Sequence, residues 1–335
     1  MGVTMNPVLG RELTERMRGP RAMVMLSVYL GVLGAIVLIV YKAMVSGANN
    51  GFGSAPVTQL AGVGQSLFEW TLMFVLLLVL FLVPGFTAGS VAGERERQTL
   101  LPMQVTLLRP IDIVLGKIGS SVMFTLLLVV ATLPLLTVSY LVGGIRVIEV
   151  FTGLALVLFT ALSVAAISVA CSTFLKRVQT ATVFSYALVL FLIVGTVIMY
   201  AVAYLVDQSR GIDIADPPAE ILAANPMVAL AELTGDDPYE RQLARNFGSG
   251  PGFGSQYSNQ LAPLSEIRVG IAPDLNFAND VRVDNFGRPQ LDEVDLPERS
   301  AIPLWVEYLA ITSVLTAVAV FASARRLRAP AEFER

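Results

Sequence analysis

Residues 93–120 separate two long apolar runs and place dense charge of both signs directly beside them. The segment begins with Glu94, Arg95, Glu96 and Arg97 and continues into an apolar stretch. Because ionised side chains are costly in hydrocarbon, this segment must lie at a water-facing surface. Alternating charge followed by apolar residues is typical of a short amphipathic helix on the membrane face. The chemistry that it indicates is a charged contact with another protein.

A solvated loop of interspersed charges is the simpler alternative for this segment. Two membrane spans can be joined by a few residues, whereas this chain uses residues 93–120. Apolar residues recur along the segment at Leu100, Leu101, Val105 and Leu108. The length and the periodicity favour the helix.

The composition is that of a protein with several membrane spans. Of its 335 residues, 55% are hydrophobic and 15% are charged, against about 25% charged residues in a typical soluble domain. There is no histidine, and Cys171 is the only cysteine. The sequence therefore excludes a disulfide within the chain, a Cys/His zinc cluster and catalysis by a Ser-His or Cys-His pair. We predict no catalytic, cofactor-binding or metal-ligating residue.

Six apolar runs are long enough to cross roughly 30 Å of hydrocarbon as helices. The predicted spans are Ala22–Tyr41, Trp70–Ala92, Ser121–Val142, Val150–Leu175, Ala181–Val206 and Pro303–Ala324. The first is too long for the apolar core of a signal peptide, so we expect it to be retained. The predicted fold class is an all-α polytopic membrane protein with six transmembrane helices.

Lysine and arginine flank these spans mainly on one side of the membrane. This side carries Arg11, Arg16, Arg18, Arg21, Arg95, Arg97, Arg109, Lys117, Lys176, Arg177, Arg325, Arg326, Arg328 and Arg335. The short loops of the other side hold only Lys42 and Arg146. Because basic residues are enriched in cytoplasmic loops, we predict a multi-pass protein of the cell membrane with both termini in the cytoplasm.

Three parts make up the predicted organisation. Residues 1–206 hold the first five spans of the transmembrane domain, and residues 301–335 hold the sixth span and a cytoplasmic tail. Residues 207–300 form an insert with 16 acidic and 7 basic residues, which the number of spans places outside the cytoplasm. Within the insert, we expect helical turns over residues 221–233, interrupted at Asn225-Pro226. Alternating residues predict short strands near 267–271 and 281–283.

Two further segments have spacing typical of membrane helices. Gly85, Gly89 and Gly93 form two overlapping G-x-x-x-G units, a pattern that allows close helix packing. Packing within one chain and contact between two copies both remain open. Residues 3–21 can form an amphipathic helix in the cytoplasmic interface, capped by Asn6 and begun by Pro7. The alternative is a basic flank that only sets the topology.

The sequence supplies no energy source for transport. Glu69 and Glu307 are expected near the outer ends of their spans, so the spans almost lack the buried charges of ion-coupled transporters. There is no G-x-x-x-x-G-K-[ST] phosphate loop. Lys117, in the only Gly-Lys pair, is interpreted as a lysine at the cytoplasmic mouth of the third span. Another subunit would have to provide the energy.

The sequence resembles the membrane permease subunit of type-2 ATP-binding-cassette (ABC) transporters. The resemblance is clearest over residues 88–117, at Glu94, Arg95, Glu96, Thr99, Leu100, Ile113, Gly116 and Lys117. The family's N-terminal elbow helix is similar to the pattern at Asn6, Pro7, Arg11, Glu12 and Leu13. Asn225-Pro226 resembles the Asn-Pro pair often seen between the fifth and sixth spans. Pro102 departs from the family pattern.

The resemblance implies a half-transporter rather than an enzyme. Two permease subunits, identical or paralogous, would form a dimer in the lipid bilayer and pair with two cytoplasmic ATPases that bind ATP and Mg. A cytoplasmic coupling helix would contact the ATPase through Glu94, Arg95, Glu96, Arg97, Thr99, Leu100 and Leu101. The predicted function is that of an exporter permease for hydrophobic or amphiphilic cargo, with no cofactor of its own and no nucleic-acid partner.

Two functions other than export are compatible with parts of the sequence. The acidic insert would suit a non-transporting scaffold that assembles or signals through an extracytoplasmic partner. A lipid-handling membrane enzyme would need carboxylates at the outer interface, for which Glu69, Glu149 and Glu307 are the candidates.

Overall fold

The computed structural model of the chain describes residues 10, 20–48, 57–98, 110–143, 145–209, 219–234, 263–264, 267, 282–283, 289–290 and 303–328. Within these ranges, six helices are long and apolar enough to cross a membrane. They are α2 (Pro20–Ala48), α3 (Val57–Thr87), α6 (Pro110–Val142), α7 (Val147–Phe174), the helix formed by α8 (Val178–Leu190) and α9 (Thr196–Ser209), and α15 (Leu304–Arg328). The predicted all-α, six-span fold is confirmed.

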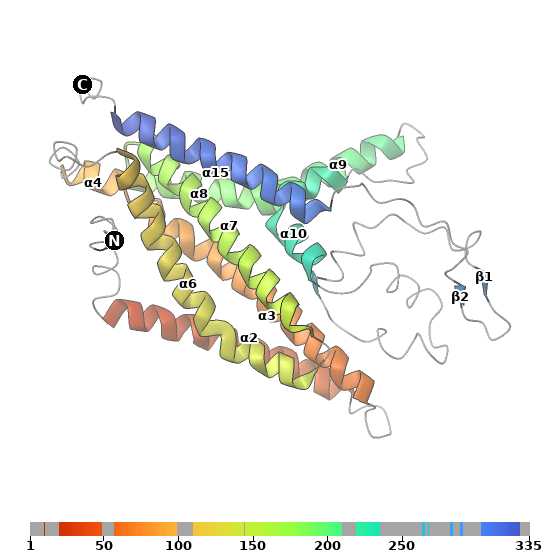
Figure 1. Cartoon of the computed structure of the whole chain (residues 1–335). Helices are drawn as coiled ribbons and strands as arrows, with labels where there is room; N and C mark the ends of the chain where they lie inside the picture. Colours follow the sequence, from red (N-terminus) through yellow and green to blue (C-terminus); the bar gives the residue numbers. More distant parts are fainter. Residues whose placement is uncertain are drawn as a thin grey trace, which may run out of the picture.

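Helix α3 packs against α2, α6 and α7 (Figure 1). Leu72, Val75 and Leu76 on it are fully buried. Helix α2, by contrast, buries a single stripe with Tyr29, Leu33 and Val37. Residues four apart lie on one face of a helix, so α2 is a peripheral helix that contacts the bundle along one side.

Two helices begin earlier than the apolar runs predicted. Helix α6 starts at Pro110 instead of Ser121, with Asp112 in its first turn. Proline at the first helical position and a carboxylate in the first turn both favour a helix start. As a result, Lys117 lies inside α6, with a side chain 1% exposed, and its position at the cytoplasmic mouth of the span stays a prediction.

The early start of α3 also changes the position of Glu69. We expected this carboxylate near the outer end of the second span, but α3 begins at Val57 and Glu69 lies well inside it. Only 1% of Glu69 is exposed. The bundle thus encloses this residue, and its position near the outer end of the span stays a prediction. Glu307 does lie at a helix end, in the first turn of α15.

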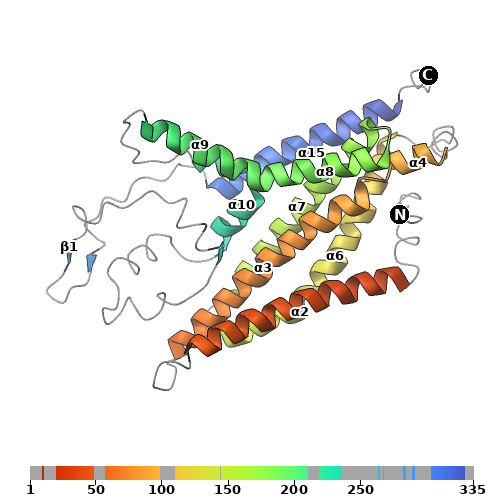
Figure 2. The same cartoon turned by 180° about the vertical axis from the view of Figure 1, so that it is seen from behind.

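The fifth span contains a break in its helical pattern. A π-helix, η1 (Phe191–Gly195), joins α8 to α9. Figure 2 shows the axis changing direction where α8 passes into α9. Such a bend is expected, because single-turn π segments are among the usual causes of kinks.

Residues 219–234, which we expected in the insert, pack against the span helices. A 3₁₀-helix η2 (Ala219–Ala224) and the helix α10 (Pro226–Leu233) contact α15, and α10 also contacts α7. Residues 226–231 are buried. The break at Asn225-Pro226 lies where the sequence predicted it. The predicted insert begins at residue 207 and so includes residues 219–234, although this segment packs against the helix bundle.

Little else of the predicted insert is described. Strand β1 (Arg282–Val283) pairs antiparallel with β2 (Pro289–Gln290). Ile267, which we expected in a strand, is helical. The proposed elbow residues Asn6, Pro7, Arg11, Glu12 and Leu13 lie outside the described residues.

A buried hydrogen bond joins the sixth span to the fourth. The hydroxyls of Tyr308 on α15 and Thr160 on α7 lie 2.8 Å apart. Because Thr160 donates to the carbonyl of Leu156 at 2.9 Å, Tyr308 is the donor in this pair.

We expect Tyr308→Phe to lower the free energy of unfolding by about 0.6 kcal/mol, the average for a hydrogen bond between membrane helices. Reversible unfolding of the purified chain in mixed micelles would measure it. Tyr204→Phe is the matched control, because Tyr204 is 38% exposed on α9. Equal losses in the two variants would contradict the prediction.

Candidate functional site

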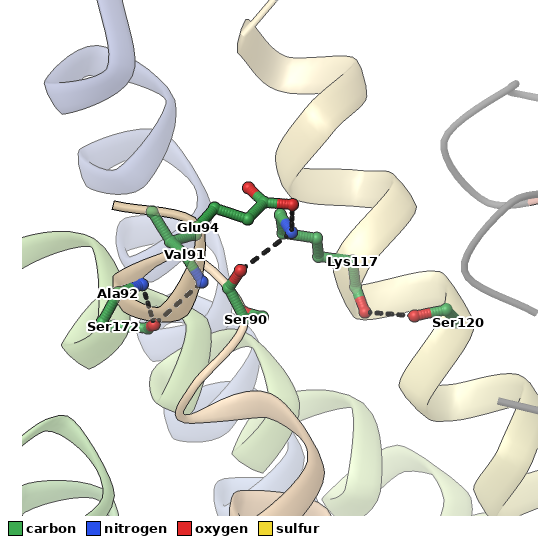
Figure 3. Close-up of polar contacts among 7 residues, drawn as sticks. All are labelled: Ser90, Val91, Ala92, Glu94, Lys117, Ser120 and Ser172. Atoms are coloured by element: carbon green, nitrogen blue, oxygen red, sulfur yellow. Dashed lines mark hydrogen bonds and ion pairs between the residues drawn. The ribbon is translucent and has the colours of Figure 1, made fainter. Parts of the chain in front are cut away.

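The charged motif of the sequence forms a short helix, α4 (Ala92–Glu96), directly after the end of α3. Glu94 and Lys117 form an ion pair in which Lys117 Nζ lies 2.8 Å from Glu94 Oε1 (Figure 3). The ammonium group of Lys117 also donates to the carbonyl of Ser90 at 2.9 Å. Lys117 thus ties α6 both to α4 and to the turn before it.

This ion pair is buried on one side and reaches solvent on the other. The side chain of Lys117 is 1% exposed and that of Glu94 is 21% exposed. Removing a charge from water costs several kcal/mol, which an opposite charge and additional hydrogen bonds can offset. Glu94 and the Ser90 carbonyl provide this compensation. The position of α4 is therefore fixed by the requirement to pair the Lys117 charge.

Ser172 of α7 holds the start of α4. Its Oγ accepts hydrogen bonds from the backbone N–H groups of Val91 and Ala92, each at 3.0 Å (Figure 3). The first N–H groups of a helix lack acceptors within the helix. Ser172 is fully buried and supplies the acceptor from a distant part of the chain. Nothing in the sequence distinguishes this serine from others in the apolar spans, so our sequence reasoning missed it.

The two residues after Glu94 contact the next helices. Arg95 donates to the carbonyls of Thr173, at 3.3 Å, and Leu175, at 3.1 Å, at the end of α7. Glu96 accepts a hydrogen bond of 2.8 Å from the backbone N–H of Val178, at the start of α8. A cation at a helix C-terminus and an anion at a helix N-terminus both complement the helix dipole.

We call Glu94, Arg95, Glu96, Lys117 and Ser172 the α4 junction. Through these side chains, one turn of helix contacts α6, α7 and α8. We expected the charges of Glu94, Arg95 and Glu96 to face a partner protein. Glu94 and Arg95 are partly buried against helices of their own chain, and Glu96 is exposed but binds the backbone N–H of Val178. The arrangement connects α4 to α6, α7 and α8 through side-chain contacts.

The remaining residues of the predicted coupling set lie at the end of α4 or beyond it. Arg97 is exposed. Gln98 has a φ of 56°, a left-handed conformation often found where a helix ends. Thr99, Leu100 and Leu101 lie outside the described residues. Contact of this set with an ATPase stays a prediction.

The glycines of the small-residue pattern face α8 of the same chain. A Cβ atom at Gly85 would lie 3.0 Å from the hydroxyl of Tyr186, and one at Gly89 would lie 3.3 Å from Val178. At Gly93 the distance to Val178 would be 3.7 Å. Tyr186 also donates to the carbonyl of Phe81 at 2.9 Å. These contacts correspond to helix packing within one chain, which was one of the two alternatives for this pattern; the other was contact between two copies.

Two of the carboxylates that a lipid-handling enzyme would need are held by contacts within the chain. Glu149 forms an ion pair with Arg146 at the start of α7, and Glu69 is enclosed in the bundle. Within the described part of the chain, no group of three His, Cys, Asp or Glu residues is placed to hold a metal ion.

Replacing Lys117 by methionine should lower the free energy of unfolding by about 3 kcal/mol. This is the low end for a broken buried pair, because Glu94 is 21% exposed. Thermal unfolding in detergent would measure the change. Arg97→Gln, at an exposed cation of the same motif, should change stability by less than about 0.5 kcal/mol.

A double-mutant cycle measures the interaction between Glu94 and Lys117 separately from the effect of each single substitution. Glu94→Gln leaves Lys117 charged and buried, so it should also destabilise the protein, whereas Glu94→Gln with Lys117→Met should cost less than the sum of both. Strictly additive losses would show that the two charges do not depend on each other.

Comparison with known proteins places the whole bundle in one family. The sequence model of the ABC-2 family transporter proteins matches residues 7–329. A search of curated proteins found no match. The matched range includes the α4 junction and all six span helices. The chain therefore belongs to the ABC-2 transporter family and is a multi-pass membrane protein, the permease component of an ABC transporter.

Proposed function

We propose that this permease forms the translocation path of an ATP-driven exporter and is moved by a separate cytoplasmic ATPase. The observation that carries the proposal is the α4 junction, in which one short helix contacts α6, α7 and α8 through charged side chains. Movement applied beside α4 would reach three spans at once. A transporter whose motor is a separate subunit requires such a connection.

The proposed point of contact follows the junction directly. Arg97, Thr99, Leu100 and Leu101 would bind the ATPase, while Glu94, Arg95 and Glu96 hold α4 against the bundle. The motif would thus combine an inner, structural half with an outer, partner-binding half. ATP and Mg²⁺ would be bound by the ATPase, and this chain would contribute no cofactor.

Exposed cations support a cytoplasmic position for the end of the bundle that holds α4. Lys176 and Arg177 are exposed between α7 and α8, and Arg325 and Arg326 are exposed near the end of α15. Figure 1 shows α4 and the C-terminal end of α15 at the same end of the bundle. Basic residues are enriched on the cytoplasmic side, so both termini would lie there, and the segment between α9 and α15 would lie outside.

The proposed cargo is hydrophobic or amphiphilic. The spans offer exposed apolar side chains, and Tyr140 adds an exposed hydroxyl-bearing ring. The transporter would contain two permease chains. Ion-coupled transporters usually contain buried ionisable residues in their spans. In the described spans, the buried acidic and basic residues are Glu69 and Lys117, and the charge of Lys117 is paired with that of Glu94.

Co-purification tests this function. In mild detergent, the chain isolated from its own cells should co-purify with an ABC-type ATPase, and Arg97→Glu should weaken the complex about tenfold, or about 1.4 kcal/mol. The expected cause is loss of an exposed cation at the proposed contact. Arg326→Glu, a charge reversal of another exposed cation, is the matched control.

Unfolding temperatures of both variants would show whether the fold is intact. If the wild-type chain purifies without the ATPase, and the ATPase hydrolyses ATP at the same rate with and without it, the exporter proposal fails.

A further inference from the structure

The π-helix in the fifth span rearranges the backbone hydrogen bonds. The N–H of Thr196 donates to the carbonyl of Phe191, five residues back, instead of the carbonyl of Leu192 four residues back. This shift removes one of the usual donors from the carbonyls inside the bend. In a membrane span, where water is scarce, such carbonyls need another donor.

Two polar side chains supply donors at this position. The hydroxyl of Thr196 donates to the carbonyl of Leu192 at 2.8 Å. The amide Nδ2 of Asn225 donates to the carbonyl of Ile193 and to Thr196 Oγ1, each at 2.9 Å. The π segment is therefore stabilised from outside its own helix, by a residue that precedes α10.

The chemistry of the site fixes the orientation of the Asn225 amide. Its Oδ1 accepts from the N–H of Met227 at 2.9 Å, which caps the start of α10. A flipped amide would set its oxygen against two acceptors and its nitrogen against a donor. Asn225 is 1% exposed and Thr196 is 4% exposed. Loss of this buried contact would leave buried acceptors without their donor, which is unfavourable.

A glycine lies at the end of the bend, where the ring of Phe191 covers it. A Cβ atom at Gly195 would lie 2.5 Å from the ring of Phe191. The ring can therefore cover this position only while residue 195 lacks a side chain. Close packing at Gly195 and hydrogen bonding by Asn225 act on the same five residues.

Asn225 connects this bend to two other spans through α10. Figure 2 shows α10 beneath the point where α8 passes into α9, and α10 contacts α7 and α15. Glu232, near the end of α10, accepts a hydrogen bond of 2.8 Å from the backbone N–H of Trp305 at the start of α15. One end of α10 is thus fixed to α15, and the residue before its other end is fixed to the fifth span.

We propose that Asn225 is a positioning residue that holds the fifth span in its π register, so that the position of α10 sets the rotation of α9. Without the amide donor, the segment regains the α-helical pattern, and this conversion shifts the register by one residue. One residue corresponds to a rotation of about 100° of α9 relative to α8. In an exporter, Asn225 would link the segment between α9 and α15 to the fifth span. This link to transport rests on the proposed function, whereas the effect of Asn225 on the helical register does not.

Spin-label distances on the full-length permease alone, in lipid nanodiscs, test the proposal. Labels are placed at Val202 on α9 and Val183 on α8, each paired with a label at Val314 on α15. All three positions are exposed, and Cys171→Ser removes the natural thiol. A rotation of about 100° moves a label on α9 by up to about 8 Å.

Asn225→Asp is the decisive variant. It keeps an oxygen to cap α10, since Asp is as good an N-cap as Asn, but it loses both amide donors. We expect a second distance for the 202–314 pair and an unchanged distance for the 183–314 pair. Loss of packing without a change of register would broaden the distance distributions of both pairs equally, and this result would overturn the proposal. Unchanged distance distributions for both pairs would overturn it as well.

Thr196 supplies an independent matched pair of variants. Thr196→Val removes the hydroxyl that Asn225 contacts and should produce the same second distance, whereas Thr196→Ser keeps the hydroxyl and should retain the single distance. If Asn225→Asp does not fold, these two variants decide the question. If no ATPase binds the chain, the proposed function fails, while the distances still test the role of Asn225.

Discussion

A lysine ammonium group enclosed among helices constrains the end of the bundle that holds α4. Lys117 lies inside α6, where its charge needs a partner that the apolar helices do not offer. Glu94 provides the opposite charge, and the Ser90 carbonyl provides a further acceptor. Because both acceptors belong to the chain that leaves α3, pairing the lysine also determines how that chain turns. The neighbouring contacts of Arg95, Glu96 and Ser172 follow from this position of α4.

The same solution, a polar side chain that satisfies groups on another helix, recurs through the bundle. Asn225 supplies donors to the bend of the fifth span, Tyr308 binds Thr160, and Glu232 caps the start of α15. In a bundle that lipid surrounds, apolar burial distinguishes poorly between alternative packings, because lipid tails are as apolar as leucine. Directional hydrogen bonds therefore add specificity that apolar contact alone would not give.

The sequence predicted those features that depend on one segment at a time. Long apolar runs are sufficient to find six spans, and the capping chemistry of Asn225 with Pro226 is sufficient to find the break before α10. The starts of α3 and α6 were misplaced because buried polar residues dilute the apolar signal there. In α3 these include Gln65, Ser66 and Glu69, and in α6 they include Lys117 and Ser120. The partners Ser172, Ile193 and Thr196 lie far from the residues they contact, and no local pattern indicates them.

The sequence distances within the α4 junction bear on how the protein is made. Glu94 is followed by Lys117 after 23 residues, by Ser172 after about 80 and by Val178, the partner of Glu96, after about 80. Chains are synthesised from the N-terminus, so α4 has none of these partners when the second span leaves the ribosome. At that stage the charges of α4 lack their later partners, and ionised side chains are costly in hydrocarbon. Because Val178 begins the fifth span, the junction can close only after this residue has been synthesised.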